Sequence, residues 1–493
     1  MRKYVWVIVF FVVCQIHAQQ LCLSDSLRID KTVADLPEVS PGKKRPWPAV
    51  VQTIGLNGIS WSISKYIAKK PFADISLATI KKNIDTGFVW DVDEFPTNLV
   101  AHPYQGGLYF AAARAWGMNY LESLPYSFAG SFIWEMFLEC EPPSVNDLIT
   151  TSIGGMVYGE VMHRISSGIL DNQARGINRG IREMGGFLID PMRGIQRLVT
   201  GEMWKHKYSK AAKASAVPVR FTLGAGYRWL TADDKAQNTY LTLHYVYNDP
   251  YEAEGRTPYE YFDLQGDLNI GSTQPFLGDI RITGLLFGET FQQKKYKALL
   301  GAFQQYSFHD SKRIISPDND LSEVPYRISE TAAFGVGAFW KTSSLKDFEI
   351  ECRGFMTGIL LGGYYTDYFR FGKRDYSFGS GFSYRTSLQI LVHNRLAVSG
   401  ETEGYKLYTL DGYRNKDKVD VSELYLDAAG DPGSGFVTMN KINVRLRLFD
   451  ELRFGTSVNW IMRYNRYRNM PAEIAASSCY KSRDVRFYVE YTF

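Results

Sequence analysis

Cysteine, long apolar runs and net charge are all scarce in this sequence. There are five cysteines in 493 residues, and no two of them form a C-x-x-C pair, so neither a disulfide scaffold nor a cysteine-based metal site is predicted. The formal net charge of +4 is small for this length and gives no support for nucleic-acid binding. Beyond the first 13 residues, no apolar run is long enough to cross a bilayer as a helix.

The composition suits a protein that crosses a membrane with strands. Aromatic residues make up 15% of the chain, and there are 43 glycines. In outer-membrane barrels, Tyr and Trp form girdles at the two interfaces, and glycine eases strand curvature. The mean hydropathy of −0.22 is compatible with this fold, because lipid-facing and lumen-facing residues alternate. A soluble β-sandwich or an ordinary barrel is the alternative.

Residues 217–493 are predicted to form an antiparallel outer-membrane β-barrel of about twelve strands. Side chains alternate in direction along each strand, so Ile442 and Leu446 are expected to face lipid, and Asn443 and Arg445 the lumen. The predicted strands span residues 217–230, 239–248, 258–270, 278–289, 295–309, 326–341, 347–361, 376–392, 396–410, 435–449, 452–464 and 484–493.

Connection lengths and the final strand indicate the compartment. Connections after odd-numbered strands tend to be long and polar, and those after even-numbered strands short, apart from 249–257. This pattern is typical of long external loops, short periplasmic turns and both barrel termini inside. The last strand ends on Phe493, which resembles the closing strand read by the barrel-assembly machinery of Gram-negative cells. The predicted location is the cell outer membrane, with lipids and that machinery as partners.

The chain start indicates export. Arg2 and Lys3 precede an apolar run of signal-peptide length, so a signal peptide is predicted over residues 1–18. Residues 19–44 are predicted to be disordered.

Residues 45–170 are predicted to form a small all-α domain. Ser144 and Asp147 form an S-x-x-D helix-start signal, and Gly155 and Gly159 lie one turn apart, which allows another helix to approach closely. The helices carry too many charges to cross lipid. Because a domain of this size cannot fit within a twelve-stranded lumen, it is expected on the periplasmic side.

Several separated motifs combine polar and glycine residues in a distinctive order. They are 90–98 (W-D-V-D-E-F-P-T-N), 102–109 (H-P-Y-Q-G-G-L-Y), Ala113-Arg114 with Gly117, Ser131 with Trp134-Glu135, 143–147, Gly154-Gly155, Gly159-Glu160 with His163-Arg164, and 190–197 (D-P-M-R-G-I-Q-R). Together they resemble the bacterial domain-of-unknown-function 3943 family over about residues 88–200. The family has no established activity, so the resemblance implies none.

Within this domain, one set of polar residues is the candidate site: His102, Arg114, Glu135, Glu160 and His163. A carboxylate beside an imidazole can act as a general acid or base, or bind a metal. The alternative is a buried ion-pair network that fixes helix packing, and this interpretation is favoured. No metal and no cofactor are predicted.

Residues 171–216 are predicted to be a basic amphipathic connector that contacts lipid headgroups, with a solvated linker as the alternative. In the barrel, Ser307 and His309 are the best local candidates for a rim hydrolase site, and His244 is expected in the lumen. The sequence has no G-x-S-x-G elbow. Each histidine is therefore interpreted first as a polar lumen or turn residue.

The predicted function is a non-enzymatic envelope component: a narrow channel, or a structural or lipid-handling protein. The alternative is an outer-membrane hydrolase acting on phospholipid or lipid A. Whether the protein is an enzyme stays open, with the prediction leaning toward no.

Overall fold

The structure is a computed structural model that describes residues 44–206, 217–230, 237–271, 274–311, 314–315, 322–323, 326–343, 347–412, 428–468 and 475–493. The predicted signal peptide, nearly all of the predicted disordered segment and the end of the predicted connector lie outside these residues. The chain divides into a helical unit, which ends at Val89 and resumes from Ala101 to Pro218, and a barrel unit of Trp90–Val100 and Val219–Thr492.

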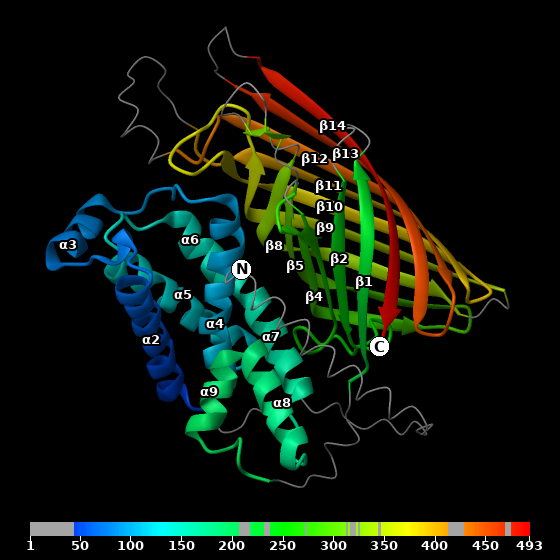
Figure 1. Ribbon diagram of the computed structural model, residues 1–493, viewed down its shortest axis with the longest axis horizontal. Coiled ribbons are helices and arrows are strands. Elements are labelled where there is room, and N and C mark those ends of the chain that lie inside the picture. The colour runs from blue at the N-terminus through cyan, green and yellow to red at the C-terminus, as the bar shows by residue number, and fades with distance from the viewer. Residues whose placement is uncertain are drawn as a thin grey trace. The chain divides into compact units, whose positions relative to one another are not determined.

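Twelve antiparallel strands close into a barrel, which confirms the predicted fold class. β1 pairs with both β2 and β14, so the first and last strands seal the sheet (Figure 1). The two-residue strands β6 (Ile314–Ile315) and β7 (Ser322–Glu323) pair separately. The barrel strands are β1 (Val219–Leu230), β2 (Gln237–Tyr247), β3 (Phe262–Ile270), β4 (Leu277–Gln292), β5 (Tyr296–Asp310), β8 (Arg327–Thr342), β9 (Phe348–Tyr365), β10 (Tyr376–Val392), β11 (Leu396–Thr409), β12 (Gly433–Arg447), β13 (Leu452–Tyr467) and β14 (Ser477–Thr492).

The outer face of the barrel is apolar, as an outer-membrane β-barrel requires. Ile442 and Leu446 on β12 are 50% and 43% exposed, whereas Asn443 is 7% exposed and lines the interior. β14 alternates in the same way, with Phe487 and Val489 outward and exposed. This alternation is the orientation that the sequence predicted.

Connections at the two rims differ in length. At the rim where β1 begins and β14 ends, four turns are short, spanning residues 293–295, 343–347, 393–395 and 448–451. In the third of these, His393 and Asn394 have φ values of 47° and 54°, and positive φ at both central residues is what a type I′ turn requires. The connections at the opposite rim include 311–326, 366–375 and 410–432. We call this opposite rim the long-loop rim.

The helical unit consists of α-helices joined by π-helical and 3-10 segments. Its elements are α2 (Pro46–Ser62), η2 (Ile63–Ile67), η3 (Pro71–Ala73), α3 (Leu77–Thr86), η4 (Thr97–Ala101, whose first residues belong to the barrel unit), α4 (His102–Ala115), α5 (Tyr120–Ile133), η5 (Trp134–Leu138), α6 (Val145–Ile149), η6 (Thr150–Gly154), α7 (Gly155–Ile169), α8 (Gly176–Ile189) and α9 (Pro191–Val199). Among the described residues, no helix is long and apolar enough to cross a membrane.

Glycines bring the backbones of α4 and α7 into contact. A Cβ atom on Gly155 would lie 2.5 Å from the carbonyl carbon of Gly106, and one on Gly159 would lie 2.8 Å from the carbonyl oxygen of Gly107. Only glycine fits at such distances without a shift of the backbone. Gly155 and Gly159 therefore allow the close approach of a second helix, and that helix is α4.

The structure differs from the prediction over much of the segment interpreted as a connector. α8 and α9 are part of the helical unit, because Met192 on α9 packs in a buried cluster with Ala111 and Ala112 on α4. Arg197 also donates two hydrogen bonds, of 2.9 and 2.6 Å, to Glu183 on α8. Basic residues of this segment thus hold helices together, and the sequence could not distinguish this role from headgroup binding.

Residues 90–100 pack against the barrel, although both neighbouring segments belong to the helical unit. Phe95 is 1% exposed, and its ring lies 5.1 Å from Phe308 and 5.0 Å from Tyr376, measured between centroids. Asn98 donates a 2.7 Å hydrogen bond to the hydroxyl of Tyr376. Trp90 stacks on Phe378 at 5.4 Å. We call residues 90–100 the strap.

The strap lies on the outward side of the wall, at the long-loop rim. Ser307 and His309 contact other lumen residues, so Phe308 between them points away from the lumen. Tyr376 and Phe378 alternate likewise with the inward Ser383 and Arg385 of the same strand. The strap therefore covers part of the wall that would otherwise be an exposed aromatic patch.

Candidate functional site

The structure separates the five predicted site residues into three groups within the helical unit. His102 and Glu135 lie together, Arg114 pairs with Glu160, and His163 faces α9. Two further carboxylates, Asp147 and Asp190, complete the first and third groups.

The first group brings together three elements that are distant in sequence. His102 is the first residue of α4, Glu135 lies in η5, and Asp147 lies in α6. One ligand atom from each of the three lies within 4.8 Å of the others. The imidazole Nε2 of His102 is 3.6 Å from the Oδ1 of Asp147. Glu135 and Asp147 are 2% and 3% exposed.

Backbone and side-chain donors hold the two carboxylates in place. The backbone N–H of Ser144 donates a 2.9 Å hydrogen bond to Glu135, and the Ser144 hydroxyl bonds Asp147. The side chain of Asn146 donates 2.8 Å to the Oδ1 of Asp147. Ser144 also caps α6 by accepting from the backbone N–H of Asp147. The predicted helix-start signal is thus present in part: the Ser144 side chain caps α6, but the backbone N–H of Ser144 donates to Glu135.

The second group is a buried ion-pair network. Glu160 is fully buried on α7 and accepts hydrogen bonds from Arg114 on α4 at 3.2 Å and from Arg164, one turn further along α7, at 2.8 Å. Its other carboxylate oxygen forms an ion pair with the Nε of Arg114 at 2.8 Å. Two guanidinium groups thus neutralise one carboxylate across the α4–α7 contact. This arrangement fits the interpretation of these residues as groups that fix helix packing.

The third group lies between α7 and α9. The Nδ1 of His163 is 3.7 Å from the Oδ2 of Asp190, and Arg193 approaches the other ring nitrogen at 3.5 Å. Burial, together with the nearby positive charges of Arg114, Arg193 and Arg164, holds the pKa of His163 well below its usual value. Burial also raises the pKa of the Asp190 carboxyl to about 6. His163 is therefore neutral at pH 7.

Asp147 and Asp190 are not among the predicted site residues. The sequence indicates Asp147 only as part of a helix-start signal and Asp190 only as part of the motif at 190–197. Both belong to segments that resemble the family. The signal that could have identified Asp147 and Asp190 is their shared position: each is a polar motif residue at the start of a helix, α6 and α9 respectively.

The barrel lumen holds a polar cavity of about 290 Å³. Its wall carries six Arg or Lys residues and seven Asp or Glu residues, so the two signs nearly balance. These thirteen residues are Arg228, Asp267, Asp279, Arg281, Asp310, Glu351, Arg353, Glu401, Glu403, Lys441, Arg445, Arg486 and Glu490.

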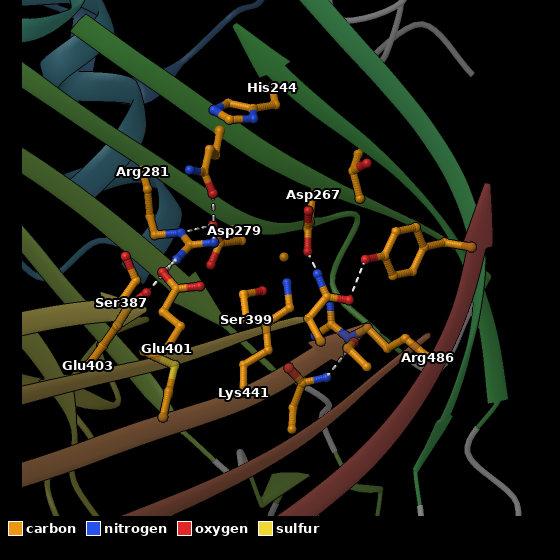
Figure 2. A pocket seen from close by; sticks show the side chains of 18 of the residues that line it. His244, Asp267, Asp279, Arg281, Ser387, Ser399, Glu401, Glu403, Lys441 and Arg486 are labelled. Carbon is orange, nitrogen blue, oxygen red and sulfur yellow. Dashed lines mark hydrogen bonds and ion pairs between the residues drawn. The ribbon is translucent and has the colours of Figure 1, made fainter. Parts of the chain in front are cut away.

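Ion pairs connect strands across the lumen wall. Arg281 on β4 contacts Asp279 at 3.2 Å and reaches Glu401 on β11 at 3.1 Å (Figure 2). Arg486 on β14 contacts Asp267 on β3 at 3.0 Å. Neither β4 and β11 nor β14 and β3 are neighbours in the sheet. The Arg281–Glu401 and Arg486–Asp267 contacts therefore cross the interior of the barrel and narrow it.

The lumen histidines are engaged in similar pairs. The Nδ1 of His309 is 2.5 Å from Asp279, and its Nε2 is 3.1 Å from the hydroxyl of Tyr405. His244 lies 2.9 Å from Asp263. Ser307 donates its hydroxyl to Glu330 at 2.8 Å. The hydroxyl of Tyr405 also donates a 3.3 Å hydrogen bond to Ser307, so Tyr405 contacts both residues, and the contacts of His309 and Ser307 are those of lumen wall residues.

Apolar side chains narrow the lumen on either side of this cavity. Toward the long-loop rim, one inward-facing cluster consists of Tyr326, Ile328, Ala333, Ile359, Tyr364, Tyr405, Leu407, Val437 and Ile461. We call it the lumen plug. Toward the other rim, the connection at 248–261 contributes Tyr251, Ala253 and Tyr261 to a second cluster with Phe303, Phe339 and Phe355.

Comparison with protein families bears out the predicted resemblance. A family model described as a domain of unknown function, DUF3943, matches residues 87–192. The match begins near the strap and ends at the start of α9, so it covers all three polar groups except Arg193. No curated protein matches the chain.

Solved structures similar to this chain are outer-membrane porins and channels. The NanC porin has a TM-score of 0.28 at 8% identity, covering 55% of this chain and 98% of that chain. The KdgM porin has a TM-score of 0.24 at 6% identity, with coverages of 55% and 99%. The outer membrane channel DcaP of Acinetobacter baumannii has a TM-score of 0.23 at 8% identity, with coverages of 56% and 97%. At these identities, the likeness concerns the fold alone.

Proposed function

We propose that this outer-membrane β-barrel is a non-enzymatic envelope protein whose lumen is a narrow polar conduit, closed to organic solutes. The observation that carries the proposal is the lumen itself: a charged cavity of about 290 Å³ that lies between two apolar clusters and is bridged by ion pairs. Water and small ions fit such a space. A sugar or a larger solute would have to displace the lumen plug.

The charge balance of the wall predicts weak selectivity. Selective pores carry rings of one sign. Here six basic residues face seven acidic ones, and Arg281 and Arg486 are paired with carboxylates. Arg445, which on its own would favour anions, lies 3.9 Å from Glu490. We therefore expect a conduit that distinguishes cations from anions poorly.

Planar-bilayer recording of the purified full-length protein tests this function. The wild type should give small conductance steps with a reversal potential near zero in a salt gradient. The double variant Tyr364→Ala/Tyr405→Ala removes two large buried rings of the lumen plug and should raise the conductance several-fold. Tyr408→Ala, on the outward face of β11 and 45% exposed, is the matched control. Large wild-type steps, or no change in the double variant, would contradict the proposal.

The rival function is hydrolysis of phospholipid or lipid A. The contacts of Ser307 and His309 do not favour it, since each is bonded to other lumen groups. Lipid mass spectrometry of a deletion strain decides the matter. If the deletion strain accumulated an uncleaved lipid, and the wild-type gene restored the normal level, the result would support a hydrolase and contradict the proposed conduit.

The strap offers a way to test which side of the outer membrane the long-loop rim faces. If short turns lie in the periplasm, as loop lengths predict, the long-loop rim and the strap face the cell exterior. Lys373 at this rim is well exposed and pairs with Asp93 of the strap at 3.0 Å. We expect a cysteine at Lys373, in a cysteine-free background, to react with a membrane-impermeant maleimide on intact cells. Labelling only after the outer membrane is opened would reverse this orientation. The chain continues from the strap into the helical unit at both ends, so the predicted periplasmic location of that unit agrees with the reversed orientation and conflicts with the first.

A further inference from the structure

We propose that His102, Glu135 and Asp147 form a binding site for a divalent transition-metal ion of the zinc or manganese class. This site is independent of the conduit, because all three residues belong to the helical unit and none lines the lumen. It changes the prediction that no metal is bound.

The donor set is the first argument. One imidazole nitrogen and two carboxylate oxygens are ligands that Zn²⁺, Mn²⁺ and Fe²⁺ accept, whereas Ca²⁺ and Mg²⁺ prefer oxygen alone. Metal–ligand bonds of about 2.0–2.2 Å place two ligand atoms at most about 4.4 Å apart. The three ligand atoms lie within 4.8 Å of one another, and the Nε2 of His102 is 3.6 Å from the Oδ1 of Asp147, so side-chain shifts of about 1 Å bring them to the separation of about 3.4 Å that a tetrahedral site requires.

Burial and charge are the second argument. Glu135 and Asp147 are nearly inaccessible to solvent, and their carboxylates approach closely. Two like charges held together away from water repel each other, and a dication between them offsets that repulsion. His102 is less buried, with 14% of its side chain exposed, so one side of the site is open to an entering ion.

The supporting hydrogen bonds are the third argument. Metal-binding carboxylates are oriented by further donors. Here the backbone N–H of Ser144 donates a 2.9 Å hydrogen bond to Glu135. The hydroxyl of Ser144 and the side-chain amide of Asn146, the latter at 2.8 Å, donate to Asp147. The backbone also departs from α-helix at each ligand: η4 ends directly before His102, η5 contains Glu135, and η6 begins shortly after Asp147. π-helical turns are rare and frequently occur at functional sites.

Three protein ligands leave at least one coordination position for water or another ligand. Structural zinc sites normally take four protein ligands, whereas sites with three keep a position open. The arrangement therefore corresponds to an open site, in which a bound water could be replaced by an anionic group.

Metal binding by the purified full-length protein, with any affinity tag removed, is the test. After chelation and dialysis, the wild type should bind one equivalent of Co²⁺ with visible d–d absorption and one equivalent of Zn²⁺ by calorimetry. Loss of a supporting donor typically costs about 10–100-fold in affinity, so loss of a ligand should cost at least about 100-fold. We expect that loss for His102→Ala and Glu135→Gln, and about 10-fold for Ser144→Ala.

His206→Ala, which removes an exposed histidine outside the group, is the matched control and should bind like the wild type. Because Asp147 and Glu135 also shape the start of α6, each variant is checked for helical circular dichroism. A wild type that binds no metal would overturn the proposal, as would a folded His102→Ala variant with wild-type affinity. Either result would make the group a structural hydrogen-bond cluster and would leave the conduit untouched.

Discussion

Phe95→Ala is expected to release the strap from the barrel wall. Phe95 is 1% exposed and lies between two rings, Phe308 and Tyr376, with the guanidinium of Arg327 5.6 Å from its centroid. Replacing a buried Phe by Ala costs about 3–5 kcal/mol, which includes the lost ring contacts. The exposed Lys373–Asp93 pair contributes at most about 1 kcal/mol, so it cannot compensate.

A loss of about 3–5 kcal/mol raises the population of the detached strap by about two to three and a half orders of magnitude. Hydrogen exchange of the solubilised full-length protein measures this directly. Amides of residues 90–100 and of the start of β10 should exchange faster by a comparable factor, limited by their protection in the wild type. Phe128→Ala, at an exposed position on α5, should change neither segment. Unchanged protection in a folded Phe95→Ala barrel would refute the packing described above.

The remaining predictions concern the helical unit. Burial raises the pKa of Asp190 from 3.8 to about 6, so its contribution to stability is present below pH 3.8 and is lost as pH rises through 6. Asp190→Asn removes the titrating carboxyl group. As pH rises from 4 to 7.5, the variant should therefore gain on the order of 3 kcal/mol in free energy of unfolding relative to the wild type, measured by thermal unfolding at 222 nm. Equal changes of stability with pH in both proteins would contradict this prediction. Gly159→Ala should destabilise the unit by about 1–3 kcal/mol, because its Cβ meets Phe110 and the backbone of Gly107. Gly180→Ala, at a position with open space around it, should stabilise α8 by about 0.5–1 kcal/mol. If the two glycine variants changed the free energy of unfolding equally, the close α4–α7 contact would be excluded.

The barrel could be predicted closely because its signals are local. Alternation with period 2 and turn residues specify each strand, and β10 spans the predicted 376–392. β14 begins at Ser477, earlier than the predicted 484, because Lys481 and Arg483 interrupt the apolar alternation that marks lipid-facing positions.

The strap could not be predicted, because its partners are distant in sequence. Phe308, Tyr376 and Phe378 face outward, and aromatic residues at such positions normally form the interface girdle. Nothing local distinguishes a ring that meets lipid from one that meets Phe95.

The candidate site was predictable in its residue types but not in its grouping. Glu160 and His163 are three residues apart on one helix, which suggests a shared environment. In the structure Glu160 meets Arg114 on α4, while His163 meets Asp190 at the start of α9. Which helix lies against each side chain depends on tertiary packing, and in this unit the glycine contacts between α4 and α7 decide it.

The claim that the lumen is closed to organic solutes is tested most directly by the swelling of proteoliposomes in isotonic arabinose. With the wild-type protein correctly folded, as its heat-modifiable migration would show, we expect swelling no faster than in protein-free liposomes, because the lumen plug leaves no path for a sugar. Swelling as fast as that of an open porin at equal protein content would contradict a closed lumen.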